Sequence, residues 1–217
     1  MLPSRMKHDD LIRLVSRLPY FEIGALKGLG HNETYVRIAL ARWTKRGTLV
    51  RLKKGLYVTR TYLNEIERKG SLSVYLEFLA SALYEPAYLS LEYVLHQHNA
   101  LTEAAVAYTM ISTRKTARFT NALGNFIYRS IKKEFFNGFT CVIRDGFPVY
   151  AASKAKALFD YLYLRKALIA DEKATEELRI NTNVFTKNDR KELTTYVTRA
   201  QSARLERIVQ ELFHKEA

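Results

Sequence analysis

Residues 31–60 read HNETYVRIALARWTKRGTLVRLKKGLYVTR, and the spacing of their apolar side chains changes at Gly47. Before Gly47 the apolar positions follow the 3.6-residue repeat of a helix and gather on one side. They are Val36, Ala39, Leu40 and Trp43. After Gly47 the repeat is two, as in a strand, and Gly55 supplies the positive φ that a tight hairpin turn needs. The stretch therefore predicts a helix, capped by Asn32, followed by a β-hairpin.

Both predicted elements carry basic residues on the side away from the core. Eight lysines and arginines fall within residues 31–60. The side chains predicted to face outward are Thr34, Arg37, Ile38, Ala41 and Lys45 on the helix, and Arg51, Lys53 and Lys54 on the hairpin. Thr34, Arg37 and Lys45 can donate hydrogen bonds to base edges or phosphates, whereas the hairpin cations would add salt-sensitive, sequence-independent affinity. Double-stranded DNA is the expected partner. The alternative is a domain that contacts protein and whose charged face is simply solvated.

Two shorter helices are predicted ahead of this stretch. The first covers residues 9–18, where one helical face holds Leu11, Ile12, Val15 and Leu18 and where Pro19 ends the helix. The second covers residues 22–30 and is broken by Gly28 and Gly30. Three helices and a basic hairpin are typical of a winged helix-turn-helix domain, which we place at residues 1–70.

The composition narrows the class of protein. Of the 217 residues 47% are hydrophobic, which is enough for a packed core, and the formal net charge is +13. Residues 1–70 hold 15 Lys and Arg against 6 Asp and Glu, so they carry +9, while residues 71–217 hold 20 against 16 and carry +4. This asymmetry favours a polyanionic partner for the first segment. No apolar run has the roughly 18 residues of a membrane span and residues 1–20 lack a signal-peptide block, so we expect a cytoplasmic protein without membrane association.

Residues 71–217 predict an α+β domain with a small antiparallel sheet covered by helices. Helical spacing appears over residues 61–84, 87–101, 154–168 and 187–213, and β patterns over 104–113, 117–131 and 139–153. The turn sequences NALGN and RDG favour antiparallel hairpins. The single cysteine, Cys141, lies among apolar neighbours and is expected to be buried and inert.

Catalytic, metal and cofactor chemistry is not expected. His96 and His98 are two residues apart and would point to opposite sides of a helix. Ser90, Ser112 and Ser153 lack a nucleophile motif, and no glycine loop suited to phosphate is present. The sequence therefore predicts a protein that is not an enzyme.

A second basic group lies among the predicted strands, interleaved with aromatic residues. Its members are Arg114, Lys115, Arg118, Arg129, Lys132 and Lys133. Cations and aromatic rings on a sheet can bind nucleic acid. The alternative, which we favour, is that the aromatic side chains form the core of the sheet and the cations its solvated face.

Three segments in order resemble the AbiEi family of antitoxins, the transcriptional regulators of type IV toxin-antitoxin systems. They are RLKKGLYV (51–58), PAYLSLEYVLHQHNAL (86–101) and YAASKAKALFDYLYL (150–164), and the resemblance spans residues 10–168. It implies an N-terminal winged helix that binds inverted repeats in its own promoter as a repressor. It further implies a C-terminal domain, residues 71–217, that counters a nucleotidyltransferase toxin without a stable complex, in a protein that is a monomer or weak dimer in solution and is paired on DNA.

The last segment departs from the family at two positions. Members often carry a Pro-Glu pair ahead of Lys-Ala-Leu, and here Lys154 and Ala155 stand there. The motif residues that match are Lys156, Ala157, Leu158 and Asp160. Because Ala155 replaces the glutamate, no acidic side chain is present at that position to play a role there.

Overall fold

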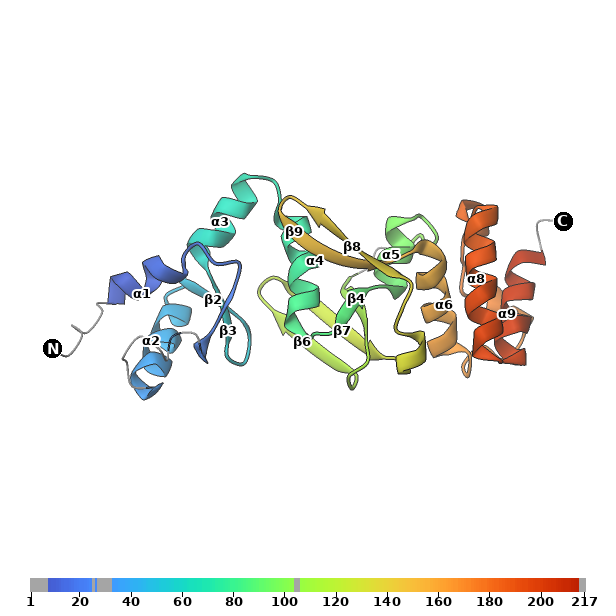
Figure 1. Cartoon of the computed structure of the whole chain (residues 1–217), viewed down its shortest axis with the longest axis horizontal. Helices are drawn as coiled ribbons and strands as arrows, with labels where there is room; N and C mark the ends of the chain where they lie inside the picture. The colour runs from blue at the N-terminus through green and yellow to red at the C-terminus, as the bar shows by residue number, and fades with distance from the viewer. Residues whose placement is uncertain (1–7, 25, 27–32, 104–105, 215–217) are drawn as a thin grey trace. The chain divides into compact units, whose positions relative to one another are not determined.

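The computed structural model describes residues 8–24, 26, 33–103 and 106–214, and shows a mixed α+β protein (Figure 1). The chain forms two compact units. The N-terminal unit comprises residues 1–76 together with 119–124, and the C-terminal unit comprises residues 77–118 and 125–217.

The N-terminal unit contains a three-stranded antiparallel sheet with helices packed beside it. Its elements are α1 (His8–Val15), β1 (Phe21–Glu22), α2 (Glu33–Lys45), β2 (Leu49–Lys53), β3 (Leu56–Thr59) and α3 (Arg60–Arg68). The strand order is β1-β3-β2, so the two-residue strand β1 pairs with the second strand of the hairpin. The predicted helix and hairpin of residues 31–60 are confirmed as α2, β2 and β3.

Two helix predictions in this unit need correction. The first helix ends at Val15, and Leu18 is 41% exposed instead of facing the core. The Ser16 hydroxyl donates to the Arg13 carbonyl (2.8 Å). A side-chain bond of this kind competes with the backbone hydrogen bonds that would extend the helix. Of the helix predicted over residues 22–30, Glu22 lies in β1, while most of the remainder lies outside the described residues.

The helical stretch predicted over residues 61–84 consists of two helices. They are α3 and α4 (Leu72–Leu83). Gly70 separates them with a φ of +73°, a conformation that glycine adopts without strain, and the Thr59 side chain caps the start of α3.

A six-stranded sheet of order β6-β7-β5-β4-β9-β8 lies mainly in the C-terminal unit, while residues 119–121 of β6 and Gly124 of β7 are assigned to the N-terminal unit. The strands are β4 (Ala87–Leu89), β5 (Tyr108–Ser112), β6 (Ala117–Asn121), β7 (Gly124–Ser130), β8 (Phe139–Arg144) and β9 (Phe147–Ala152). The pairs β4–β5 and β8–β9 are antiparallel, but β5–β7 and β4–β9 are parallel. The prediction of a small antiparallel sheet is therefore wrong for this unit.

The burial of each hairpin explains the mixed topology. β7 and β9 carry buried side chains, whereas none of the residues of β6 and β8 is fully buried. The apolar strand of each hairpin pairs inward, next to β5 or β4, and leaves its partner at an edge of the sheet. Each inward pairing is parallel, and the sequence contains no local pattern that reports it.

Two further predictions are corrected at this sheet. Residues 87–89, predicted as the start of a helix, form the buried strand β4, and the helix α5 (Leu91–Gln97) begins only after Ser90. Cys141, predicted to be buried, is exposed because it lies on the edge strand β8. Its apolar neighbours Val142 and Ile143 are exposed with it, at 52% and 66%.

Helices lie at one end of this unit (Figure 1). They are α6 (Lys154–Arg165), α7 (Glu172–Glu176), α8 (Lys187–Ala200) and α9 (Ala203–Phe213), with single turns at Lys133–Phe135 and Thr182–Val184. α6 confirms the helix predicted from residue 154. Gln201 adopts a left-handed conformation (φ 46°) and divides the predicted final helix into α8 and α9. None of the helices in the described ranges combines the length and hydropathy needed to span a bilayer.

Candidate nucleic-acid interface

Helix α2 is oriented as its sequence predicts. Val36, Leu40 and Trp43 are at most 8% exposed and pack in the core of the N-terminal unit with Val15, Phe21 and Leu49. The five side chains predicted to face outward, Thr34, Arg37, Ile38, Ala41 and Lys45, are all exposed. The outward face of α2 therefore presents cations around small or medium side chains, and Ile38 is 48% exposed there.

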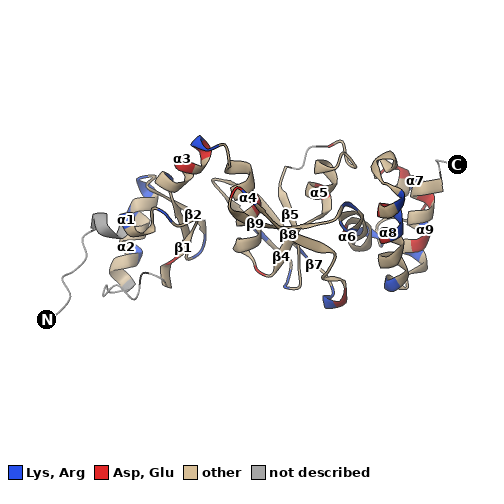
Figure 2. Cartoon of the chain, turned by 45° about the horizontal axis from the view of Figure 1, so that its top comes forward, with Lys and Arg blue, Asp and Glu red and all other residues tan. Residues whose placement is uncertain are grey.

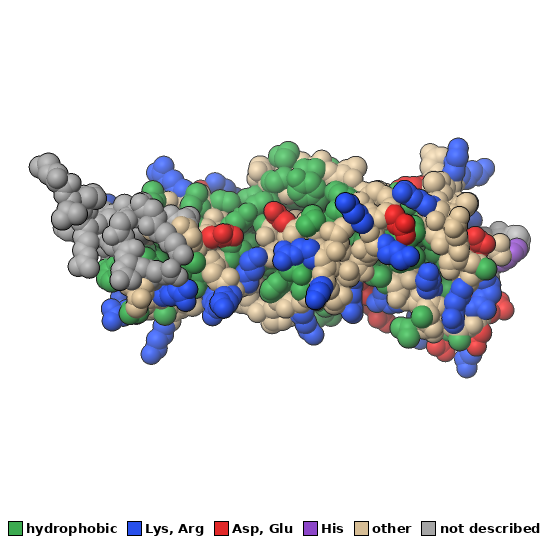
Figure 3. All heavy atoms as spheres, turned by 60° about the horizontal axis from the view of Figure 1, so that its bottom comes forward, with side chains coloured by type: hydrophobic (Ala, Val, Ile, Leu, Met, Phe, Trp, Pro, Cys, Tyr) green, Lys and Arg blue, Asp and Glu red, His purple; other side chains and the backbone are tan. Residues whose placement is uncertain are grey.

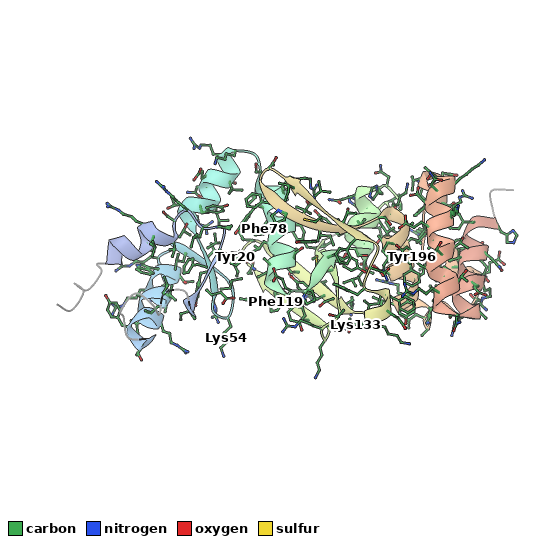
Figure 4. The ribbon with its side chains drawn as sticks, in the orientation of Figure 1. Tyr20, Lys54, Phe78, Phe119, Lys133 and Tyr196 are labelled. Carbon is green, nitrogen blue, oxygen red and sulfur yellow. The ribbon has the colours of Figure 1, made fainter. Side chains whose placement is uncertain are left out.

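The hairpin β2–β3 presents its cations at the turn. Val50 and Leu52 are buried, whereas Arg51 and Lys54 are exposed and Lys53 is partly so. The turn needs a left-handed residue after Lys54, and Gly55 supplies it with a φ of +82°. Figure 4 shows Lys54 at the tip of this hairpin.

A bulge in the hairpin is held by a residue distant in sequence. The register between β2 and β3 shifts between Arg51 and Lys53, which leaves Leu52 without a cross-strand partner. The Asn121 side chain donates to the Leu52 carbonyl (3.0 Å) and accepts from the Leu123 backbone N–H (2.8 Å). Asn121 thus anchors the base of the basic turn. The NALGN turn was predicted, but this contact was not, since nothing local joins residues 52 and 121.

In the N-terminal unit a long stretch of sequence contains basic residues but no acidic ones. No aspartate or glutamate occurs between Glu33 and Glu65, a span that contains eight lysines and arginines. Over the N-terminal part of the molecule basic side chains outnumber acidic ones (Figures 2 and 3). Of the acids on α3, Glu65 forms an ion pair with Lys69 (2.7 Å), which lowers the pKa of the Glu65 carboxyl. The span from Thr34 to Arg60, which holds the outward side chains of α2 and the hairpin, therefore carries only positive formal charge.

The second basic group lies in the C-terminal unit, around one end of parallel strands. Because β5 and β7 are parallel and pair Ser112 with Ser130, the segments that follow them leave the sheet at the same edge. The six cations Arg114, Lys115, Arg118, Arg129, Lys132 and Lys133 are all exposed. Arg114 lies over the Tyr84 ring (4.1 Å), and Lys132 pairs with Glu134 (3.7 Å).

The aromatic side chains near these cations belong mainly to the core. Phe126, Tyr128 and Phe135 are at most 3% exposed, and Phe119 and Phe136 are half-buried. Three of the five rings are therefore closed to a base that would stack on them. Their burial agrees with the interpretation of this group as a solvated basic face.

The motif residues Lys156, Ala157, Leu158 and Asp160 are completely buried within the C-terminal unit. Lys156 Nζ forms an ion pair and hydrogen bond with Asp160 Oδ1. Asp160 Oδ2 accepts hydrogen bonds from Tyr88 (3.0 Å) and Ser90 (2.8 Å). Burial raises the pKa of the Asp160 carboxyl and lowers the pKa of the Lys156 ammonium, since each charge loses its hydration. This pair holds α6 to β4 and to the start of α5, and has no surface to offer a partner.

Side chains from α8 complete the surroundings of Lys156. Its ammonium lies 4.9 Å from the Phe159 ring centre and 5.5 Å from that of Tyr196, which the view with side chains places between α8 and α6 (Figure 4). Glu192 accepts from Ser153 (2.6 Å) and from Tyr196 (3.1 Å). Burial and the Glu192 carboxylate raise the pKa of Tyr196 to about 12, so Tyr196 is a neutral donor at ordinary pH. The i, i+4 Lys–Asp spacing on an apolar helix was the available sequence signal for this network.

His96 is half-buried and His98 is exposed. Within the described ranges no three His, Cys, Asp or Glu side chains come together as metal ligands would.

Neither a comparison with protein-family models nor one with curated proteins finds a match to this chain.

Proposed function

We propose that this protein is a DNA-binding transcriptional repressor whose N-terminal unit is a winged helix-turn-helix domain. The observation that carries the proposal is the shared orientation of two elements. α2 and the hairpin β2–β3 both bury apolar side chains and expose cations, and after Glu33, the first residue of α2, these elements contain no acid.

The topology supports the same assignment. The order β1-β3-β2, with the hairpin following α2, is the arrangement expected when the hairpin forms the wing beside a recognition helix. A helix with its side chains is about 10–12 Å wide, and the major groove of B-DNA is about 12 Å wide. The small Ala41 at the centre of the outward face favours close approach, while Thr34, Arg37 and Lys45 would contact base edges and phosphates.

The wing would supply affinity that does not depend on sequence. Arg51, Lys53 and Lys54 lie at or next to the turn, where each phosphate contact would release counterions. Asn121 supports this role because its hydrogen bond fixes the bulge from which the turn projects.

The resemblance to the AbiEi family extends the proposal to an antitoxin that counters a nucleotidyltransferase toxin and that binds inverted repeats in its own promoter. The C-terminal unit would carry the antitoxin role without forming a stable complex. Lys156 and Asp160, the matching motif positions, are buried. They would therefore act by maintaining the fold of that unit, and its surface would contact other molecules.

The test is a gel-shift titration of the full chain on its own promoter and on a scrambled duplex at several salt concentrations. Arg37→Ala is expected to weaken promoter binding by roughly 5- to 150-fold and to reduce the preference over scrambled DNA, as loss of a base contact does. Lys53→Ala with Lys54→Ala should weaken both duplexes alike and reduce the salt slope by about 1.8. Arg68→Ala, an exposed arginine on α3, is the matched control. Binding of both test variants at the control's level would overturn the assignment.

A second candidate function rests on the six cations at the edge of β5 and β7. In this alternative the protein binds RNA through the region from Arg114 to Lys133, and the winged helix is a scaffold. It predicts binding of transfer RNA without promoter preference, lost on Lys132→Ala with Lys133→Ala. A neighbouring nucleotidyltransferase gene, and rescue of its toxicity by co-expression, would favour the antitoxin instead.

A further inference from the structure

A hollow of about 330 Å³ opens in the C-terminal unit, beside Arg114 of the second basic group. Its lining residues are Ser81, Glu85, Pro86, Ala87, Phe136, Phe139 and Tyr150. They come from α4, from the segment that enters β4, from the turn before β8, and from the hairpin β8–β9. The volume is at the lower end of the range of ligand sites, roughly 300–1,000 Å³.

Aromatic rings form the walls of this hollow. The Phe136 and Phe139 rings meet edge to face with centres 5.3 Å apart, and the Phe139 and Tyr150 rings do so at 6.4 Å. Behind them the buried Tyr88 ring stacks on Phe139 at 4.4 Å. Because Tyr88 is fixed by its hydrogen bond to Asp160, it supports the inner wall as a rigid surface.

Two oxygen-bearing side chains line the same hollow. The Ser81 hydroxyl is buried, the residue being 5% exposed, and it has no hydrogen-bond partner among the described residues. A buried hydroxyl without a partner is uncommon, because its lost hydration is uncompensated. Glu85 is exposed, and no lysine or arginine in the described ranges forms an ion pair with its carboxylate.

Arg114, the cation that contacts Glu85, bonds to its backbone and not to its carboxylate. Arg114 donates to the backbone carbonyl of Glu85 (3.2 Å) and lies over the Tyr84 ring. A negative charge therefore stands beside aromatic walls and an unpartnered hydroxyl, which disfavours phosphate-bearing ligands and favours a cation with several donors.

Exposed apolar side chains lie on the hairpin that lines the hollow. Tyr150, a lining residue on β9, is 38% exposed, and Val142 and Ile143 on the paired strand β8 are 52% and 66% exposed. Exposed apolar side chains around a pocket are typical of surfaces that contact protein.

We propose that this hollow receives the side chain of an arginine from a partner protein. The guanidinium is planar and can stack on the aromatic walls, while its N–H groups donate to Ser81 Oγ and to the Glu85 carboxylate. A lysine ammonium lacks the planar face, and an uncharged side chain gains nothing from Glu85. The exposed apolar side chains of the hairpin β8–β9 then contact the residues that flank the arginine. This inference is independent of DNA binding by the N-terminal unit.

The test is an NMR titration of the isotope-labelled full chain with the blocked tripeptide acetyl-Ala-Arg-Ala-amide. The same tripeptide with citrulline, which is neutral but has nearly the same shape, is the matched ligand control. Chemical-shift changes should centre on Ser81, Phe136 and Tyr150, and the citrulline peptide should bind at least about tenfold more weakly because a charge-assisted hydrogen bond is lost. Equal binding of the two peptides, or shifts confined to other surfaces, would overturn the proposal.

Variants separate the pocket from the fold. Glu85→Gln changes an exposed carboxylate, so the fold should persist while arginine-peptide binding weakens by roughly tenfold. Glu206→Gln on α9 is the matched control, since Glu206 is also exposed, and it should bind as wild type. If Glu85→Gln binds the arginine peptide like Glu206→Gln, the proposal is wrong. A further outcome is that the wild-type chain self-associates in a way that Glu85→Gln abolishes. That result would mean that the arginine comes from a second copy of this chain, and it would refute a distinct partner.

Discussion

The buried pair Lys156–Asp160 gives the sharpest stability prediction. Lys156→Met removes the ammonium but keeps much of the volume of the side chain. Asp160 then retains two hydroxyl donors, from Tyr88 and Ser90, in a site that is 0% exposed and has no cation within bonding distance. Breaking a buried pair in this way lowers the free energy of unfolding by about 3–5 kcal/mol.

The double variant Lys156→Met with Asp160→Leu is expected to be less damaging than the sum of its parts. Neither charge is then buried alone, and what is lost is the acceptor for the two hydroxyls, about 1–3 kcal/mol for each. Since each single change costs about 3–5 kcal/mol, the double-mutant cycle should give a coupling energy of several kcal/mol.

Calorimetry and urea titration followed by circular dichroism measure these values. A loss of about 3–5 kcal/mol in a unit of this size corresponds to a fall in Tm of roughly 10–15 °C. Trp43, the only tryptophan, lies in the N-terminal unit, so its fluorescence reports that unit as an internal control. A coupling energy near zero, or a Lys156→Met cost below about 1 kcal/mol, would refute the reasoning.

The cost of Lys156→Met should also depend on pH. Burial already raises the pKa of Asp160, and loss of the ammonium raises it further, above the value of about 3.9 in the unfolded chain. An acid whose pKa is raised on folding destabilises the fold increasingly as pH rises above the unfolded-state pKa, and this penalty disappears only when pH falls below that value. The difference in unfolding free energy between variant and wild type should therefore shrink from pH 7.5 toward pH 4. A difference that grows on acidification would contradict the assignment.

Three further predictions concern packing, an edge strand and a helix cap. Gly138→Ala should destabilise more than Gly70→Ala, because both glycines have φ near +72° (71° and 73°) but only at Gly138 would the added Cβ lie 2.1 Å from Tyr196 Oη; denaturant midpoints that shift equally would show that this packing does not matter. Ile143→Lys, on the exposed edge strand, should leave Tm within about 2 °C of wild type and reduce concentration-dependent aggregation measured by light scattering. Ser153→Ala should lower the free energy of unfolding by about 1–2 kcal/mol because the Ser153 hydroxyl caps α6, and a urea midpoint like that of wild type would argue against the cap.

The spacing of apolar residues predicted an element correctly where its conformation depends on residues close together in sequence. The change from a helical repeat to a repeat of two located α2 and the hairpin, and the inward and outward side chains of α2 were assigned correctly from the 3.6-residue period alone. The RDG turn gave the hairpin β8–β9, and the helix from residue 154 was found for the same reason. In each case the apolar residues that specify the element lie within a dozen positions of one another.

Pattern failed where the outcome depended on distant partners. Residues 87–89 are apolar enough for a helix or a strand, and only their position between β5 and β9 makes them β4. Cys141 has apolar neighbours, yet it is exposed because β8 has a partner on one side only. The contact between Asn121 and Leu52 joins residues 69 positions apart.

The sequence by itself determined the basic character of residues 34–60, the helix and hairpin that expose it, and the α+β class, since charge and periodicity are properties of neighbouring residues. Tertiary structure decided the parallel pairing that brings two basic segments to one edge, the burial of Lys156 against Asp160, and the hollow beside Ser81. Each of these joins side chains from separate elements, and the free energy of burying apolar strands, which no short stretch encodes, selects which elements meet.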